Sequence, residues 1–203
     1  MNTTVQASVN ATQYGAGLIG QCSTAVKISY TSVFNSNFNA TQYVGGFIST
    51  SSQNIQIINS SLQNTTFILS QNIGGFIGTL QSGSTLQLSL CQVYNITVLA
   101  NINIGGFVGF VDTSSQIVFS DSLINNCSIK GIQNVGGLIG TVGQYSTLKI
   151  VSQKIISMNI TSQSNFGVVV GYKQNIFTVS SSIQEGENYL NNIKYKNCVN
   201  LTC

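Results

Sequence analysis

Side chains able to act as catalysts are scarce in this 203-residue chain, which has no histidine and no arginine. Two carboxylates can serve as general acid and base at a glycosidic bond, and Asp121 follows the inward-facing Phe119 closely enough to lie at the rim of a strand. Asp112 is expected in the preceding turn. Because no third polar partner of a suitable kind accompanies them, we predict no catalytic residues. The four acidic residues are Asp112, Asp121, Glu185 and Glu187.

Cysteine is the other residue type that could carry chemistry, and its five copies match no metal-binding spacing. With no histidine to complete a ligand set, we predict neither a metal site nor a cofactor. Cys127 has the inward parity of its strand, where a small buried side chain is expected. Cys198 and Cys203 lie in a polar tail and are candidates for a disulfide. The odd total leaves one thiol free or paired outside this segment.

Asparagines followed two residues later by serine or threonine are potential acceptors of N-linked glycans. Asn64, Asn95 and Asn126 are spaced by 31 residues and have outward parity. In a secretory pathway they could carry a stripe of glycans, although an Asn- and Thr-rich chain also forms such triplets by chance. Neighbouring strands lie only about 4.8 Å apart, so we expect some sites, not all, to be occupied. The candidates are Asn39, Asn59, Asn64, Asn95, Asn126, Asn159 and Asn200.

A repeat must position these residues. A glycine phrase, seen in residues 73–78 as IGGFIG, returns six times, and its second residue falls at 16, 45, 74, 105, 136 and 167. The spacings of 29, 29, 31, 31 and 31 residues indicate stacked repeats over almost the whole chain. No copy is followed by the Lys-Ser/Thr pair of a phosphate-binding loop. The glycines are therefore interpreted as turn and close-packing positions.

Within the third repeat, Leu86, Leu88 and Leu90 alternate with polar residues, and Ile96 and Val98 do the same. Such alternation indicates strands with one buried face, and we expect about three short strands in each repeat. Equivalent positions line up between repeats. The sequence thus predicts an all-β fold, a right-handed parallel β-helix (β-solenoid) of about six coils with a period of 29–31 residues. Its height would be roughly 29 Å at about 4.8 Å per coil.

Two sets of equivalent residues are predicted to stack from coil to coil. Asparagine occupies the position two residues before the glycine pair in four coils, and Tyr14 and Tyr43 occupy it in the first two. We expect a ladder in which the side-chain amides bond to the backbone of the next coil; a polar binding stripe is the alternative. The predicted ladder positions are Asn72, Asn103, Asn134 and Asn165, with Phe47, Phe76, Phe107 and Leu138 after the glycine pair.

The repeat divides the chain into three segments. Residues 1–13 form a lead-in or cap, residues 14–182 the β-solenoid array, and residues 183–203 a polar cap or junction that contains cysteines. Residues 1–10 lack the pattern of a secretory signal, so a secreted protein would be a mature form or a fragment. No apolar run is long enough for a membrane-spanning helix. The seven lysines are scattered and the net charge is +3, which argues against nucleic-acid binding.

The phrase NVGGLIG at residues 134–140, with its period near 30, resembles the GLUG repeat, named for Gly-Leu-hydrophobic-Gly. The resemblance covers roughly residues 14–180, and the first and sixth copies depart from the pattern. It implies a β-solenoid segment of a large surface or secreted adhesin-like protein. Similar repeats occur in bacterial IgA-specific peptidase-type proteins, but the HExxH zinc motif of a peptidase is absent here.

These observations predict a non-enzymatic extracellular structural or adhesive protein at the cell surface, such as a stalk, coat or filament subunit. Its expected partners are copies of itself stacked end to end, neighbouring modules of the same protein, or a host or matrix surface. A ligand-binding solenoid for carbohydrate or ice is the alternative. The outward positions are too mixed for the regular rows of ice binders, and the inward placement of most aromatic residues weakens sugar stacking. A polysaccharide-cleaving β-helix enzyme is a less favoured alternative.

Overall fold

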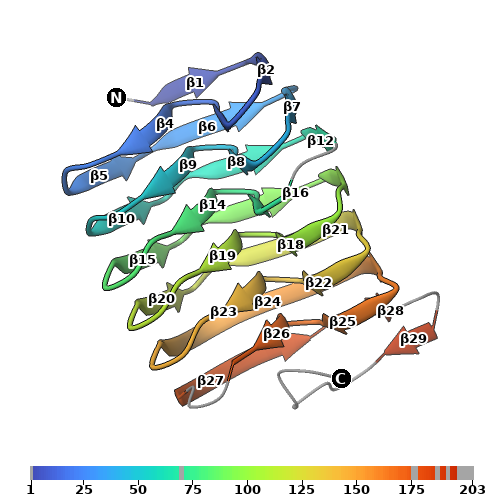
Figure 1. Cartoon of the computed structure of the whole chain (residues 1–203). Coiled ribbons are helices and arrows are strands. Elements are labelled where there is room, and N and C mark those ends of the chain that lie inside the picture. Colours follow the sequence, from blue (N-terminus) through green and yellow to red (C-terminus); the bar gives the residue numbers. More distant parts are fainter. Residues whose placement is uncertain (1, 69–70, 175–177, 186–187, 191–192, 196–203) are drawn as a thin grey trace.

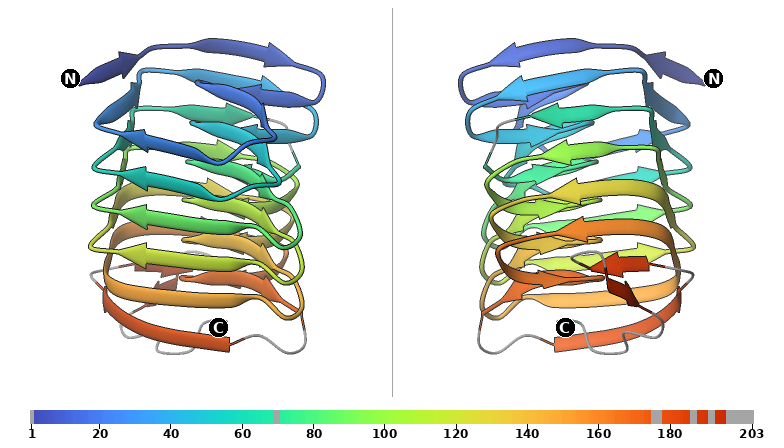
Figure 2. Two further views of the ribbon diagram at one scale, coloured as in Figure 1. Left: turned by 90° about the vertical axis from the view of Figure 1, so that its left-hand side faces the viewer. Right: turned by 90° about the vertical axis from the view of Figure 1, so that its right-hand side faces the viewer.

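The computed structural model describes residues 2–68, 71–174, 178–185, 188–190 and 193–195, with side chains described up to residue 174. Every regular element among them is a strand. The chain winds as a right-handed parallel β-solenoid, and successive coils stack along one axis from β1 to β27 (Figures 1 and 2). The predicted fold is therefore confirmed. Among the described residues no helix could span a membrane.

Sheet A forms the long wall of the solenoid and contains three columns of parallel strands. The first column consists of β5 (Val26–Ser29), β10 (Ile55–Ile58), β15 (Thr85–Ser89), β20 (Gln116–Ser120), the first part of β24 (Thr147–Thr161), and β27 (Thr178–Glu185). The second consists of β1 (Thr3–Val5), β6 (Thr31–Phe34), β11 (Ser61–Gln63) and β16 (Gln92–Tyr94), then the first part of β21 (Leu123–Lys130) and the middle of β24. The third consists of β2 (Ser8–Ala11), β7 (Asn37–Ala40), β12 (Thr66–Ile68), β17 (Thr97–Leu99), the end of β21 and of β24, and β28 (Asn188–Leu190).

Two six-stranded parallel sheets close the other side of the coils. Sheet B contains β3 (Tyr14–Ala16), β8 (Tyr43–Gly45), β13 (Ile73–Gly74), β18 (Ile102–Gly105), β22 (Gln133–Gly136) and β25 (Ser164–Gly167). Sheet C contains β4 (Ile19–Cys22), β9 (Ile48–Ser51), β14 (Ile77–Leu80), β19 (Val108–Val111), β23 (Ile139–Val142) and β26 (Val170–Lys173). A typical coil thus has five strands, so the expectation of about three was wrong.

The two ends of the chain join this arrangement. Residues 3–11, predicted as a lead-in or cap, form β1 and β2, which pair in parallel with β6 and β7. In the segment 183–203, β28 pairs in parallel with β24, and β29 (Ile193–Tyr195) then pairs with β28 in the antiparallel sense. This hairpin departs from the parallel order of the coils.

The core is built from equivalent apolar side chains stacked one coil apart. The Phe47 and Phe76 rings are stacked with centroids 4.4 Å apart, and Phe76 and Phe107 follow at 5.4 Å. Leu138 takes the same position in the next coil and is fully buried. Each of these side chains removes apolar surface from water and packs on its own equivalent, so the coil-to-coil period is fixed by the core.

The bends of sheet A are made by residues in the left-handed backbone region. Asn64, Asn95 and Asn126 have φ of 49°, 51° and 51° at the second bend, which lies between the second and third columns of strands. Asparagine tolerates the left-handed region better than most residues. At the first bend Leu90 has a φ of 55° and is 50% exposed, although strict alternation placed it inside with Leu88. The bend reverses the parity, and the next residue, Cys91, takes the buried position.

A buried hydroxyl follows the bend residue in several coils and satisfies backbone groups that the bend removes from the strand ladder. Ser122 Oγ accepts a hydrogen bond from the Cys91 backbone N–H at 3.1 Å and donates to the Ser120 carbonyl at 2.9 Å. Ser60 Oγ makes the equivalent contacts with the Thr31 N–H and the Ile58 carbonyl. Since a buried N–H without a partner is costly, these small polar residues stabilise the bends from inside.

Candidate functional site

Sheets B and C contact each other on their outward side along a line parallel to the solenoid axis, which we call the crease. Their backbones approach so closely that only glycine fits: a Cβ on Gly109 in β19 would lie 2.6 Å from the Ile73 nitrogen in β13. Farther out, Thr141 Oγ1 donates a hydrogen bond to Asn103 Oδ1 at 2.7 Å across the crease. One wall of the crease carries Tyr14, Tyr43, Asn72, Asn103, Asn134 and Asn165, and the other carries Thr50, Thr79, Phe110, Thr141 and Tyr172.

The four asparagines of the sheet B wall form a continuous ladder. Asn103 Nδ2 donates to Asn72 Oδ1 at 2.7 Å, Asn134 to Asn103 at 2.8 Å, and Asn165 to Asn134 at 2.9 Å. The amides therefore bond to one another, and the expectation of amide-to-backbone bonds was wrong in this detail. Asn103, Asn134 and Asn165 have φ between 52° and 59°, so the conformation that favours asparagine here also aligns the side chains.

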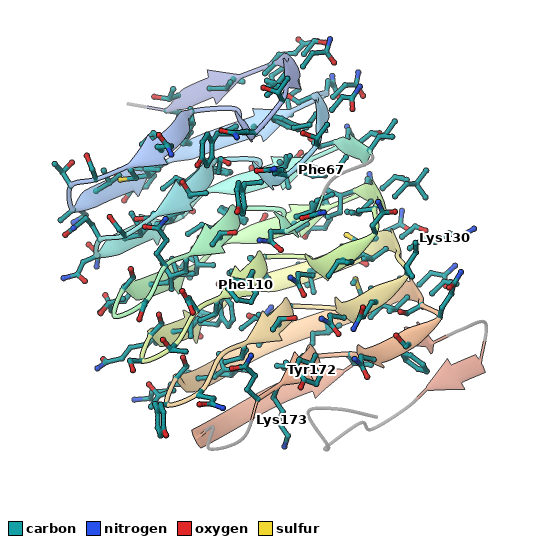
Figure 3. The ribbon with its side chains drawn as sticks, in the orientation of Figure 1. Phe67, Phe110, Lys130, Tyr172 and Lys173 are labelled. Atoms are coloured by element: carbon teal, nitrogen blue, oxygen red, sulfur yellow. The ribbon has the colours of Figure 1, made fainter. Side chains whose placement is uncertain are left out.

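Aromatic rings lie outward on both walls, contrary to the expectation that most aromatic residues lie inside. Tyr14 and Tyr43 are stacked on each other with centroids 5.4 Å apart. Phe110 and Tyr172 lie on the sheet C wall and project from the same side of the solenoid (Figure 3). Tyr172 is 40% exposed. The available signal was the position directly after the last glycine of each phrase. It is occupied by Thr79, Phe110, Thr141 and Tyr172 in successive coils.

A second asparagine ladder follows the second bend of sheet A. Asn64 Nδ2 donates to Asn35 Oδ1 at 3.2 Å, Asn95 to Asn64 at 3.0 Å, and Asn126 to Asn95 at 2.7 Å. The spacing of these three glycan candidates thus coincides with a backbone bend. Each nitrogen that would carry a glycan already donates to the preceding coil.

The other glycan candidates lie elsewhere. Asn39 in β7 and Asn159 in β24 are exposed strand residues, and Asn59 occupies the first bend with a φ of 47°. Asn200 lies outside the described residues. The three asparagines of the predicted stripe thus share the second bend, and the other described candidates lie at the first bend and at two strand positions.

The two described carboxylates do not form a catalytic pair. Asp112 Oδ1 accepts a hydrogen bond from the Thr113 N–H at 2.7 Å in the turn before β20. Asp121 lies after β20, exposed at a bend with a φ of 48°, and not at a strand rim as expected. A strand of this length spans about 16 Å at about 3.3 Å per residue, beyond the carboxylate separations of glycosidases. The Glu185 side chain and Glu187 lie outside the described set.

The three described cysteines, Cys22, Cys91 and Cys127, are buried free thiols. Cys91 and Cys127 follow bend residues, and their Sγ atoms donate to the Ser89 and Asn125 carbonyls as the serines of other coils do. Burial raises the pKa of Cys91 to about 11 and the pKa of Cys127 to about 12, so both remain protonated at neutral pH. Cys198 and Cys203, the disulfide candidates, lie outside the described residues.

On the part of the surface that the structure describes, the other hollows are shallow and contain no metal-binding cluster. Leu99, Lys130 and Ile132 border a hollow of about 250 Å³ beside the third column of sheet A; Lys130 is marked in Figure 3. Where side chains are described, no group of three His, Cys, Asp or Glu residues could hold a metal ion. Comparison of the chain with protein-family models, curated proteins and solved structures finds no match.

Proposed function

We propose that this chain is a non-enzymatic structural and adhesive module of an extracellular or cell-surface protein. The observation that carries the proposal is that its polar groups are used from coil to coil. The amides of Asn35, Asn64, Asn95 and Asn126 bond in series, as do those of the crease. The two described carboxylates lie apart, and the buried thiols of Cys91 and Cys127 stay protonated. A stack of identical contacts suits a rigid spacer, which separates the exposed end of a surface protein from its anchored end.

The resemblance of the glycine phrase to the GLUG repeat supports the same role, because such repeats occur in large surface adhesins. Coils of this kind can continue into neighbouring modules or stack on another copy, since each strand offers its free edge to the next coil. Only 5% of the residues are charged, so the solubility of the chain depends on its amides and hydroxyls. N-glycans at exposed strand positions such as Asn39 and Asn159 would increase that solubility.

Two measurements test this proposal. Labelling of intact cells with a membrane-impermeant amine reagent is expected to modify exposed lysines such as Lys27 and Lys149; labelling only after lysis would overturn the surface location. Electron microscopy of natively purified material is expected to show rods. Filaments of constant width would indicate end-to-end stacking, isolated short rods would indicate a module of a larger protein, and compact particles without rods would overturn the structural role.

A further inference from the structure

We propose that the crease between sheets B and C binds a neutral β-1,4-linked polysaccharide, which lies parallel to the solenoid axis against Phe110 and Tyr172. This inference names a ligand class for the adhesive role and rests on that proposed function. It follows from the spacing of the two rings, the amides beside them, a buried hydroxyl without a partner, and the absence of charge along the described crease column.

The two rings have the spacing that a linear sugar chain requires. Phe110 pairs in register with Thr141, and Thr141 with Tyr172, so the rings are two coils apart along one column. Two coils correspond to about 9.6 Å, which is close to the length of one disaccharide unit in an extended β-1,4-linked chain. Every second sugar would therefore present the same face to a ring. Figure 3 shows both side chains on the same side of the molecule.

Each ring has an amide of its own coil on the facing wall. Asn103 precedes Phe110 in one coil and Asn165 precedes Tyr172 two coils later, and neither asparagine is fully buried. An asparagine amide has two N–H donors and an acceptor oxygen with two lone pairs, and the ladder uses one donor of each. An apolar ring face together with nearby amides suits a sugar, which has apolar C–H faces and a rim of hydroxyls.

A buried hydroxyl in the same column independently calls for a polar partner. Thr79 lies one coil before Phe110 and is 7% exposed, and its Oγ1 has no hydrogen-bond partner in the described structure. Thr141 finds its partner in Asn103 of the preceding coil, but Tyr43 occupies that position for Thr79. Buried hydroxyls are normally satisfied, but the Thr79 oxygen is shielded from solvent, so a sugar hydroxyl would reach it only after the neighbouring side chains shift.

The charge of the crease selects a neutral ligand. From Thr79 to Tyr172 the sheet C column is Thr, Phe, Thr and Tyr, and the facing ladder consists of asparagines. Lys173 follows Tyr172 but belongs to the next position of β26. An acidic polysaccharide or a nucleic acid would need clustered cations. Among the described residues, Phe34 and Tyr94 are also two coils apart, in the second column of sheet A, with Gln63 between them. Tyr30 and Tyr145 lie singly at turns.

The test is isothermal titration of the full chain with the hexasaccharides of β-1,4-linked glucose and of β-1,4-linked N-acetylglucosamine. The α-1,4-linked glucose hexasaccharide serves as the ligand control, because its helical shape does not place successive sugars in one line. We expect binding of at least one β-linked hexasaccharide and none of the α-linked one. Preference between the two β-linked chains identifies the sugar and supports the inference in either case.

Variants keep the test specific. Phe110→Thr and Tyr172→Thr introduce the residue that the same column already has in other coils, so the solenoid is expected to fold, as checked by circular dichroism. Each is expected to weaken binding about tenfold, and the double variant to abolish it. Tyr30→Asn, which removes an exposed ring from the opposite side and matches Asn59 in the next coil, is the control and should leave affinity unchanged.

The inference is overturned if the unaltered chain binds neither β-linked hexasaccharide, or if the folded double variant binds as tightly as the unaltered chain. Surface labelling of intact cells separates this failure from failure of the proposed function. If intact cells are labelled but the chain binds no sugar, the surface role stands and the ligand is wrong. If the chain binds sugar but is labelled only after lysis, the ligand stands and the surface role is wrong.

Discussion

The two sides of each coil solve the problem of turning a strand in different ways. Sheet A turns at residues with left-handed φ and tolerates Tyr, Asn, Leu, Asp and Ser at its first bend. Sheets B and C instead turn against each other through glycines whose missing Cβ lets backbones touch. The recurring glycines of the repeat therefore mark backbone contact between sheets, whereas the variable bends of sheet A depend on the buried residue that follows them.

Substitution in the glycine seam is expected to have the largest effect. Gly109→Ala places a Cβ within 2.7 Å of backbone atoms of Ile73, Asn72 and Gly78, which cannot move independently. We expect a loss of about 3 kcal/mol or more in the free energy of unfolding, measured by urea titration with circular dichroism. Gly20 has the same place in the first copy, but its Cβ would meet nothing closer than 3.9 Å. Gly20→Ala should therefore cost under about 0.5 kcal/mol, and equal losses would refute the contrast.

On the sheet A side, the interior hydroxyl is expected to matter more than the exposed one two residues away. Ser122→Ala leaves the buried Cys91 N–H without its acceptor, which should cost about 2 kcal/mol. Ser120→Ala removes a half-exposed side chain of the same type and should cost under about 0.5 kcal/mol. Hydrogen exchange of the Cys91 amide provides a local readout. Unchanged protection in Ser122→Ala would show that the hydroxyl does not support the bend.

The same contrast explains how far the sequence could predict the structure. The period, the parallel stacking and the buried Phe76 column follow from spacing alone, because identical side chains recur at identical intervals. The number of strands could not be predicted, since Leu90 continues the alternation of Leu86 and Leu88 and nothing in three leucines reveals a left-handed φ. A signal did exist in Asn59-Ser60 and Asp121-Ser122, where a small polar residue at an inward position follows a residue that favours that region.

The crease was harder to anticipate than the bends. It depends on two sheets folding against each other, which is a property of the whole coil and leaves no local pattern. The asparagine ladder itself was visible as a spacing of 31 residues from Asn72 to Asn165, but Phe110 and Tyr172 share their position with the threonines Thr79 and Thr141, so no aromatic repeat marks it. Only the register of sheet C places them in one row.

Titration of a bend cysteine is expected to have a moderate effect. Burial raises the pKa of Cys127 to about 12 from an ordinary value of 9.0, so between those values the unfolded chain loses its proton while the folded chain keeps it. Stability is then unaffected below pH 9 and falls as the pH rises, by about 1.4 kcal/mol per unit. Urea titrations at pH 8 and pH 10 should show a difference of about 1.4 kcal/mol between the unaltered chain and Cys127→Ser. An identical pH response would contradict the burial of this thiol.

The exposed ladder of sheet A is expected to contribute least, because its amides compete with water. Asn95→Ala loses two ladder bonds and must adopt a φ of 51° without the tolerance of asparagine, so we expect a loss of about 1 kcal/mol. Asn95→Gly loses the same bonds but accepts this φ freely. If the backbone dominates, the glycine variant costs only a few tenths of a kcal/mol; if both variants cost the same in urea titration, the amide ladder is what holds the bend.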